Sequence, residues 1–185
     1  GLLQTSHATT PVIILALLAL FAIPFGRAAI AATLAGIQLG LAHGLSVLEI
    51  TVLFFIATTI STLVAWQVLE MLLRRPADWM RAWLRKVEFV KNKLEWLRKR
   101  HGTFAFLAIA NALSSQIYVS AIALLMGEKE KDAVPALVAG SLASYFIPLL
   151  IFFTAQALTF DGITALLATL ALFEIIRSTL AKALP

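Results

Sequence analysis

The chain has 185 residues, of which 61% are hydrophobic, and its mean hydropathy is +0.92. A soluble domain is about 45–50% apolar, so this excess cannot be buried in one small core and indicates that the lipid bilayer is the solvent. The chain contains no cysteine, which excludes disulfides and thiol chemistry. The formal net charge is +5, and its meaning depends on where the charged residues lie.

The first long apolar segment, 11–42, is interrupted at its midpoint by Pro24, Gly26 and Arg27. As one helix it would be about 48 Å long, which exceeds a hydrocarbon core of about 30 Å. Each half has only about 15 residues, which is short for a full span. Because proline and glycine favour a chain reversal, we predict a re-entrant hairpin that enters from outside. Two short tilted spans joined at the same point are the alternative.

The segment 47–73 is predicted to span the membrane and to end at a strongly basic region. Residues 74–101 contain ten of the fifteen Lys and Arg residues, so the positive-inside rule predicts that this segment is cytoplasmic. Within it, 76–101 has the signals of a helix. Pro76 suits the first turn, and Gly102 suits the residue after the end.

The predicted helix carries one apolar stripe, because six apolar residues recur at spacings of three and four: Met80, Trp83, Val87, Val90, Leu94 and Leu97. This pattern favours an amphipathic helix at the membrane surface, anchored by tryptophan and attracted to acidic lipid head groups. The predicted membrane-surface residues are Trp79, Trp83, Arg85, Lys86 and Trp96. A projecting coiled-coil arm and a nucleic-acid contact are alternatives. The heptad pattern is short for a coiled coil, and a basic segment beside a bilayer is ordinary, so we do not expect nucleic acid as a partner.

Charge placement also distinguishes two topologies for the second half of the chain. If 103–127 crossed the membrane fully, the lysines of GEKEKD (127–132) would lie outside. If 103–127 is instead a re-entrant hairpin, these lysines are cytoplasmic, 133–158 crosses outward and the last helix, 162–181, returns. The second topology keeps nearly every Lys and Arg on the cytoplasmic side, and we therefore prefer it.

The predicted fold is an all-α polytopic integral membrane protein with a single membrane domain over 1–185. Two re-entrant or broken helical hairpins and three spanning helices form an inverted-repeat arrangement, together with the basic amphipathic cytoplasmic helix. Such repeats are common in secondary transporters. Small residues at every fourth position predict close helix packing: Ala28, Ala32, Gly36, Gly40 and Gly44, then Ala136, Gly140 and Ser144.

Arg27 is the sharpest candidate for a binding residue. A charge at membrane depth is costly, so it should face protein, water or an anion. The helix that restarts at Ala28 points its N-terminus at the same place, and Gly26 lets the backbone approach a ligand. We therefore predict a phosphate or carboxylate site at Arg27 and Gly26. The alternative is that Arg27 reaches an interface or pairs with an acid such as Glu49.

The second hairpin has a polar tip in the sequence NALSSQ. Its side chains could hydrogen-bond a substrate, or they could satisfy the backbone groups that a bend leaves free. The candidate substrate-binding residues at this tip are Asn111, Ser114, Ser115 and Gln116.

Signals of an enzyme are poor. His7, His43 and His101 are scattered and none has a metal-binding spacing. The sequence has no serine nucleophile elbow and no glycine-rich phosphate loop. We therefore expect no enzyme activity, no catalytic residue, no metal site and no cofactor.

Three stretches resemble the small multidrug export family of prokaryotic membrane proteins: ALFAIPFGRAAIAATLAGIQLGL, LRKRHGTFAFLAIANAL and SAIALLMGEKEKDAVPALVAGSLASYFI. The resemblance covers most of the chain, roughly 15–158. That family looks like a distant relative of the DedA superfamily, whose members resemble hairpin-containing lipid transporters. The resemblance implies a prokaryotic cell membrane and a transport role for Arg27 and the second tip. Two features depart from the family, because no acidic residue precedes Arg27 and the second tip is not rich in proline and glycine.

The expected function is a small membrane transporter, flippase-like, that binds an anionic substrate or lipid head group near the midplane. The alternative is a non-catalytic subunit or scaffold of a larger membrane assembly, with the helix at 77–100 as its docking surface and Met80 and Trp83 in the contact. The expected partners are the lipid bilayer and either further copies of the chain or other subunits of a membrane complex.

Overall fold

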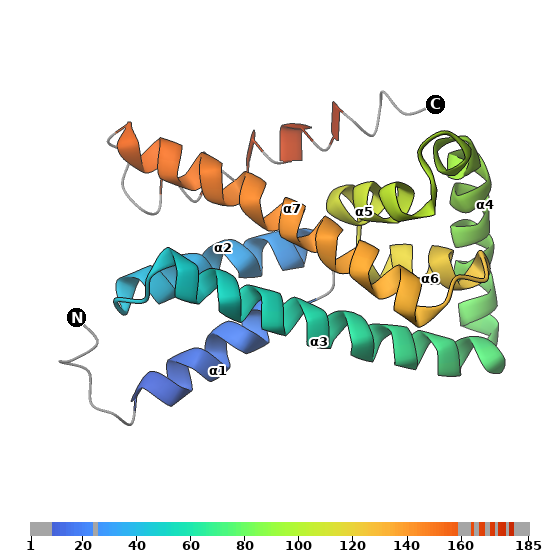
Figure 1. Cartoon of the computed structure of the whole chain (residues 1–185), viewed down its shortest axis with the longest axis horizontal. Coiled ribbons are helices and arrows are strands. Elements are labelled where there is room, and N and C mark those ends of the chain that lie inside the picture. Colours follow the sequence, from blue (N-terminus) through green and yellow to red (C-terminus); the bar gives the residue numbers. More distant parts are fainter. Residues whose placement is uncertain are drawn as a thin grey trace. The chain divides into compact units, whose positions relative to one another are not determined.

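The computed structural model describes residues 9–23 and 26–158, together with isolated positions between 164 and 179. The two continuous stretches form helices joined by turns, without a strand, and this confirms the predicted all-α class. The expected last helix, 162–181, lies largely outside the described residues. The helices in chain order are α1 Thr9–Phe21, α2 Gly26–Ala42, α3 Val47–Arg74, α4 Asp78–His101, α5 Thr103–Leu113, α6 Gln116–Leu125 and α7 Glu130–Ala157 (Figure 1).

Each segment that the sequence predicted as a hairpin contains two helices separated by a break. α1 ends at Phe21 and α2 begins at Gly26, while Pro24 lies outside the described residues. α5 ends at Leu113 and α6 begins at Gln116. The longest of these four helices, α2, has 17 residues and is therefore about 26 Å long, shorter than the core of a bilayer.

Local signals in the sequence explain where α3 begins. The backbone N–H of Glu49 donates to the Ser46 hydroxyl at 3.2 Å, and the backbone N–H of Ser46 donates to the Glu49 carboxylate at 3.3 Å. This reciprocal capping box satisfies two of the N–H groups that a helix start leaves free. Glu49 therefore has a local structural role at the start of α3.

The contacts within the chain group its residues into two compact units, and the predicted single membrane domain stays a prediction. The first unit contains 1–58 and 144–185, and the second contains 59–143. The boundaries between the units fall inside α3 and α7, so each of these long helices has one part in the first unit and the other part in the second. The first unit therefore has the α1–α2 pair with two partial long helices. The second has the α5–α6 pair with the other two partial helices and α4.

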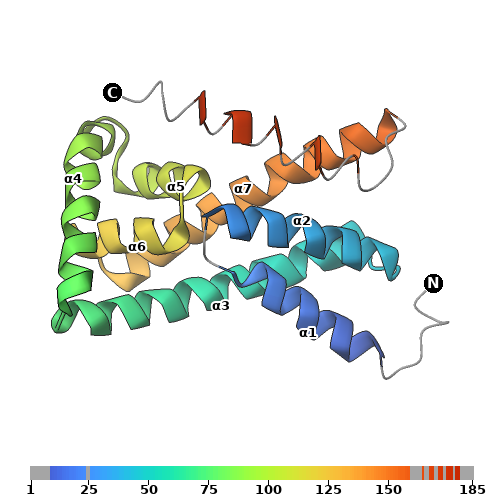
Figure 2. The same ribbon diagram turned by 180° about the vertical axis from the view of Figure 1, so that it is seen from behind.

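In the first unit, α1 and α2 lie side by side (Figure 2). Two glycines of the predicted small-residue row stand at close contacts. A Cβ on Gly36 would lie 2.5 Å from the Phe21 ring, and one on Gly40 would lie 2.9 Å from the Ile50 side chain. Phe21 also makes an edge contact with Phe54, with ring centroids 5.4 Å apart. The small residues here serve helix packing.

Tyr145 belongs to the part of α7 that lies in the first unit, and its side chain contacts the start of α3. Its ring stacks on Phe54 with a centroid distance of 4.4 Å, and its hydroxyl lies 2.9 Å from the Thr51 hydroxyl. Tyr145 is buried. The hydrogen bond gives its polar group a partner inside an otherwise apolar core.

In the second unit, α4 packs its apolar stripe against α5 and α6. Met80 and Val87 are buried, and the other four stripe residues pack against the same core. The face that the spacing predicted is therefore covered by protein. The buried core of this unit comprises Trp66, Leu69, Met80, Val87, Phe106, Leu107, Val119, Ala121, Ile122, Ala123, Ala133, Ala136 and Leu137.

α3 leaves much of its apolar surface exposed. It has 28 residues, and its most apolar 18-residue window has a mean hydropathy of 2.1 with 28% of that window buried. Among the described residues, α3 is the one helix long and apolar enough to cross a membrane. The core helix of a soluble protein would be mostly buried. The large exposed side chains along α3 include Leu48, Val52, Phe55, Ile56, Ile60, Val64, Val68 and Met71.

Candidate functional site

The α5–α6 pair leaves α4 and returns to it. α5 begins after the single residue Gly102, and both helices of the pair contact α4. α5 has 11 residues and α6 has 10, so they are about 16 and 15 Å long. The loop after α6 brings the Glu128 carboxylate to 3.6 Å from the guanidinium of Arg98, near the end of α4. The pair is thus a helical hairpin with both ends on the side of α4.

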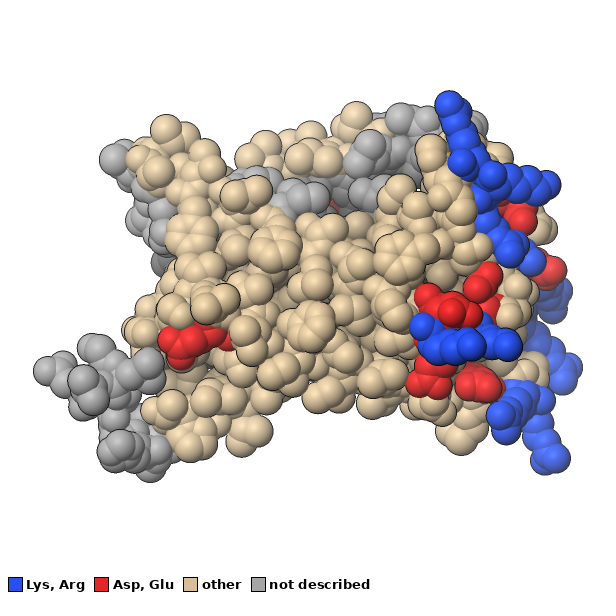
Figure 3. All heavy atoms as spheres, in the orientation of Figure 1, with Lys and Arg blue, Asp and Glu red and all other residues tan. Residues whose placement is uncertain are grey.

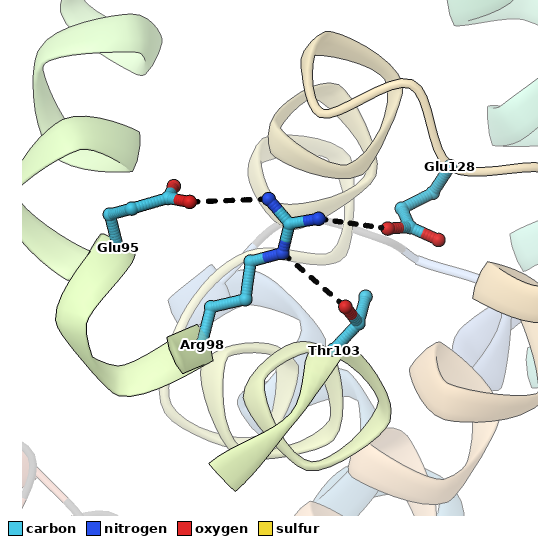
Figure 4. A network of polar contacts seen from close by, with 4 residues as sticks. All are labelled: Glu95, Arg98, Thr103 and Glu128. Atoms are coloured by element: carbon cyan, nitrogen blue, oxygen red, sulfur yellow. Dashed lines mark hydrogen bonds and ion pairs between the residues drawn. The ribbon is translucent and has the colours of Figure 1, made fainter. Parts of the chain in front are cut away.

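Arg98 joins the two ends of this hairpin (Figure 4). Its Nη1 lies 3.2 Å from the Glu95 carboxylate, and its Nη2 contacts Glu128. Its Nε donates a hydrogen bond of 3.3 Å to the hydroxyl of Thr103, the first residue of α5. The planar guanidinium can serve three partners at once because its donors point in fixed directions. We call these four residues the Arg98 cluster: Glu95, Arg98, Thr103 and Glu128.

Glycine shapes the connection at each end of the hairpin. Gly102 has a φ of 84° and Gly127 has a φ of 76°, both in the left-handed region that glycine adopts without strain. A Cβ would meet nothing within 4 Å at either position. Backbone conformation, and not lack of space, therefore requires glycine here.

Asn111 connects the hairpin to α7 by hydrogen bonds. It is 4% exposed, and its Nδ2 donates to the Leu137 carbonyl and, at 2.9 Å, to the Ser141 hydroxyl. The neighbouring Gly140 lets α7 approach, since a Cβ there would lie 2.9 Å from the Asn111 Cβ. Of the two interpretations of this predicted site residue, the contacts favour bonding within the protein.

Gln116 ties the hairpin to α3. Its Nε2 donates a hydrogen bond to the hydroxyl of Thr62, which is fully buried. Ser114 and Ser115 lie between Asn111 and Gln116 and form the break between α5 and α6. Both have extended backbones. Ser114 is exposed and Ser115 is half-buried. The four predicted tip residues therefore lie at one turn, with Asn111 and Gln116 engaged and Ser114 facing outward.

The first predicted tip is described in part. Gly26 and Arg27 are the first two residues of α2, so the arginine lies in the first turn of a helix. The side chain of Arg27 lies outside the described residues, and so does Pro24. The predicted anion site at Arg27 and Gly26 therefore stays a prediction.

The predicted membrane-surface residues of α4 fall into two groups. Trp79 is 71% exposed and Trp96 is 41% exposed, and Arg85 and Lys86 are exposed as well. Trp83 instead packs against the core of the second unit, with its ring edge-on to Tyr118 at 6.1 Å. Its position in the apolar stripe explains this difference. Together with the buried Met80, the partly buried Trp83 packs on the core formed with α5 and α6, and the docking role that the scaffold interpretation gave these two residues stays a prediction.

Charged side chains of the second unit gather at α4 and at the adjoining ends of α3 and α7 (Figure 3). The remaining parts of its helices, 59–69, 102–127 and 133–143, contain no Asp, Glu, Lys or Arg. Among the described residues, no group of three or more His, Cys, Asp and Glu residues could hold a metal ion.

Comparisons of this chain with family models, curated proteins and solved structures found no match. The resemblance given above therefore rests on the quoted stretches alone.

The Arg98 cluster was missed from the sequence. The spacing of Glu95 and Arg98 by three residues is a readable signal for a local pair. Glu128 lies 30 positions further along the chain, and its approach to Arg98 depends on the return of the hairpin. The hydrogen bond of 2.7 Å from Gln67 to Glu130 was missed for the same reason.

Proposed function

We propose that this chain is a multi-pass protein of a prokaryotic cell membrane and a small, flippase-like transporter that binds an anionic group near the midplane. The exposed apolar length of α3 supports the membrane environment, because a surface of this kind is stable only when something apolar covers it. No cofactor or metal takes part in this proposal.

The observation that carries the transporter proposal is a repeated arrangement of helices. α1, α2 and α3 are followed later by α5, α6 and α7, and each series has two short helices and one of 28 residues. The first pair packs in a unit with the start of α3 and the end of α7. The second pair packs with the end of α3 and the start of α7. In an inverted repeat, α7 of the second series corresponds to α3 of the first. Each hairpin pair is then expected to pack with the start of the long helix from its own series and with the end of the other long helix.

The return of α5–α6 to α4 supports a re-entrant hairpin. Neither helix is long enough to cross a bilayer, and GEKEKD lies beside the basic helix through Arg98 and Glu128. By the positive-inside rule both belong to the cytoplasmic side. The exposed Trp79, Lys86 and Trp96 support contact of α4 with acidic lipid head groups.

Cysteine labelling tests this topology, because the chain has no cysteine of its own. Lys129→Cys and Lys99→Cys should both react with a membrane-impermeant maleimide from the cytoplasmic side. Ala42→Cys, at the end of α2, should react from the outside. Labelling of position 129 from the outside would refute the hairpin and the inverted repeat with it.

Arg27 carries the proposed anion site because it combines a positive charge with the first turn of α2, where free N–H groups favour an anion. Arg27→Ala should abolish translocation of a fluorescent anionic phospholipid in proteoliposomes, while Arg27→Lys, which keeps the charge, should retain part of it. Unchanged translocation in the alanine variant would contradict this assignment.

A scaffold function is the second candidate, and the outward face of α4 favours it. Phe89 is 60% exposed and lies seven residues before the exposed Trp96, so both point away from the stripe that packs on α5 and α6. The Lys93 ammonium lies 4.5 Å from the centroid of the Phe89 ring. An aromatic pair among basic side chains fits an acidic partner subunit. Copurification at fixed stoichiometry that Phe89→Ser and Trp96→Ser abolish would support it, and purification alone as a homo-oligomer would count against it.

A further inference from the structure

The outward face of α4 lies opposite the side that packs on α5 and α6. Because a helix turns by about 100° per residue, Phe89 lies about 160° around α4 from the fully buried Val87. Both views show α5 and α6 on the same side of α4 (Figures 1 and 2). In the topology proposed above, the hairpin enters the bilayer from α4. Its outward face then points to the cytoplasm and not to the hydrocarbon core.

Two lines of side chains follow this face with the same spacing of seven residues. The apolar line is Ala82, Phe89 and Trp96, and all three are exposed. Four residues after each member comes a member of the basic line, which is Lys86, Lys93 and Arg100. A step of four residues places the basic line about 40° to one side of the apolar line. A heptad repeat of apolar side chains with charges beside it is the pattern that one helix presents to another.

The exposed surface of α4 keeps a positive excess after its acids are counted. It has six basic and two acidic side chains, which are Asp78, Arg81, Arg85, Lys86, Glu88, Lys93, Lys99 and Arg100. Asp78 lies 3.5 Å from Arg81, on the same helix. Glu88 lies about 140° around the helix from Lys93, so it is remote from the basic line. Two copies of this face would repel each other, and charge complementarity therefore favours an acidic partner over a second copy.

The arrangement of the charges favours a helix over a nucleic acid. The Lys93 ammonium lies 4.5 Å from the centroid of the Phe89 ring, so a cation already covers one face of this ring. A nucleic-acid base would need such a ring face for stacking. A nucleic acid also carries a charge on each nucleotide, and its phosphates would meet Glu88 as well as the lysines. An amphipathic helix can carry its acids along one side only.

We propose that the outward face of α4 binds one acidic amphipathic helix of a cytoplasmic protein. Its apolar side chains pack on Phe89 and Trp96, and its carboxylates lie opposite the basic line, Lys86, Lys93 and Arg100. This inference rests on the scaffold function and the cytoplasmic placement of α4 proposed above, and it names the chemistry of the partner. The aromatic pair supplies anchors of the kind that dominate interfaces, and the basic line sets the orientation of the partner.

The test is binding of a synthetic helical peptide to the full chain in phosphatidylcholine nanodiscs, followed by fluorescence anisotropy. The labelled peptide has about three heptads, with leucine on its apolar line and glutamate along one side. A matched peptide has glutamine in place of glutamate, and empty nanodiscs give the background. The chain should bind the glutamate peptide about tenfold more tightly than the glutamine peptide. This difference should shrink as the salt concentration rises.

Variants of the aromatic pair test the anchors. Phe89→Ser with Trp96→Ser should weaken binding of the glutamate peptide by about tenfold or more, since the loss of an aromatic anchor removes buried contact area. Trp79→Ser is the matched control, because Trp79 is 71% exposed but lies about 80° around the helix from Phe89. It should leave the affinity unchanged. All three side chains are exposed, so the variants should fold, and thermal melts check this.

Variants of the lysines test the basic line. Lys86→Gln with Lys93→Gln should remove the preference for the glutamate peptide. Lys129→Gln with Lys131→Gln removes the same charge from exposed positions at the start of α7 and should keep the preference. Equal binding of the two peptides by the wild type would overturn the proposal. Equal loss in the two lysine pairs would also overturn it, because net charge alone would then explain the binding.

Lipid and nucleic acid are the competing covers of this face. Phe89→Cys labelled with bimane, in nanodiscs that contain phosphatidylglycerol, should be quenched by aqueous iodide and not by doxyl-labelled lipid. The reverse result would show that lipid covers the face and would overturn the proposal. Tighter binding of a single-stranded oligonucleotide than of the glutamate peptide would also overturn it. Peptide binding without any copurified subunit would support this inference and count against the scaffold function, so the two can fail separately.

Discussion

Single polar side chains hold the apolar helices of the second unit together. Asn111 reaches Ser141 and Leu137 on α7, and Gln116 reaches Thr62 on α3. The short α5 and α6 bury apolar residues in the core of this unit, and directional bonds to both long helices also help to fix their position. Asn111 and Thr62 are buried, so water does not compete for these bonds.

Replacement of Asn111 should show this coupling directly. Asn111→Ala and Ser141→Ala should each destabilise the chain, and the two effects should not add, because both remove the same hydrogen bond of 2.9 Å. The coupling energy in a double-mutant cycle should be about 0.5–1.5 kcal/mol. Unfolding in detergent, followed by circular dichroism, measures it. Strictly additive effects would show that the bond does not stabilise the fold.

The Arg98 cluster should respond to salt and to the shape of the basic group. Arg98→Ala should lower the free energy of unfolding by about 1 kcal/mol at low salt and by less at high salt, since the side chains are only partly buried. Arg98→Lys should recover part of this loss, because an ammonium cannot reach three partners. Arg81→Ala, which breaks an exposed pair of 3.5 Å with Asp78 on the same helix, is the matched control with a smaller effect. Equal losses at positions 81 and 98 would contradict the joining role of the cluster.

At the scale of the element, α4 has two different faces. The apolar stripe packs on α5 and α6, while Phe89 and Trp96 point outward. Periodicity identified the stripe correctly. It could not decide whether lipid or protein covers it, because both media favour the same residues.

Charge substitutions should separate the two faces. Val87→Asp places a carboxylate at a position with 0% exposure and should cost several kcal/mol or prevent folding. Phe89→Asp, two residues away on the exposed face, should change stability by about 0.5 kcal/mol or less. Thermal melts of the two variants in the same detergent provide the comparison. Equal destabilisation would mean that the outward face is also covered.

The row of small residues in α7 allows close packing where α7 crosses α5. A Cβ on Gly140 would overlap the Ala108 carbonyl of α5, and a backbone atom cannot move aside as a side chain can. Gly140→Ala should therefore destabilise the chain by about 1–3 kcal/mol through overpacking. Ala143→Val, at an exposed position of the same helix, is the control and should have little effect. A neutral Gly140→Ala in thermal unfolding would exclude the close crossing.

At the scale of the whole molecule, the exposed apolar side chains along α3 need an apolar environment. We therefore expect the protein to stay in the membrane fraction after washes with high salt and with alkaline carbonate. A peripheral protein held only by its basic helix would leave the membrane in high salt, because screening weakens its attraction to acidic lipids. Immunoblots of the pellet and the supernatant distinguish these results, and release into the supernatant would contradict the multi-pass proposal.

The sequence by itself determined the features that depend on neighbours along the chain. Composition and periodicity predicted the all-α class, and charge placement set the basic helix apart. Proline, glycine and serine marked the two breaks. These features depend on helix length, backbone conformation and the amphipathic period, all of which act within about one to three turns.

The tertiary structure alone decided which polar residues meet. It placed Glu128 against Arg98, Gln67 against Glu130 and Asn111 against Ser141, across separations of 30 to 63 positions. It also covered the stripe of α4 with protein. The physical reason is that such contacts depend on how the hairpin returns and where the long helices cross. No local pattern encodes the crossing point of two helices distant in the chain.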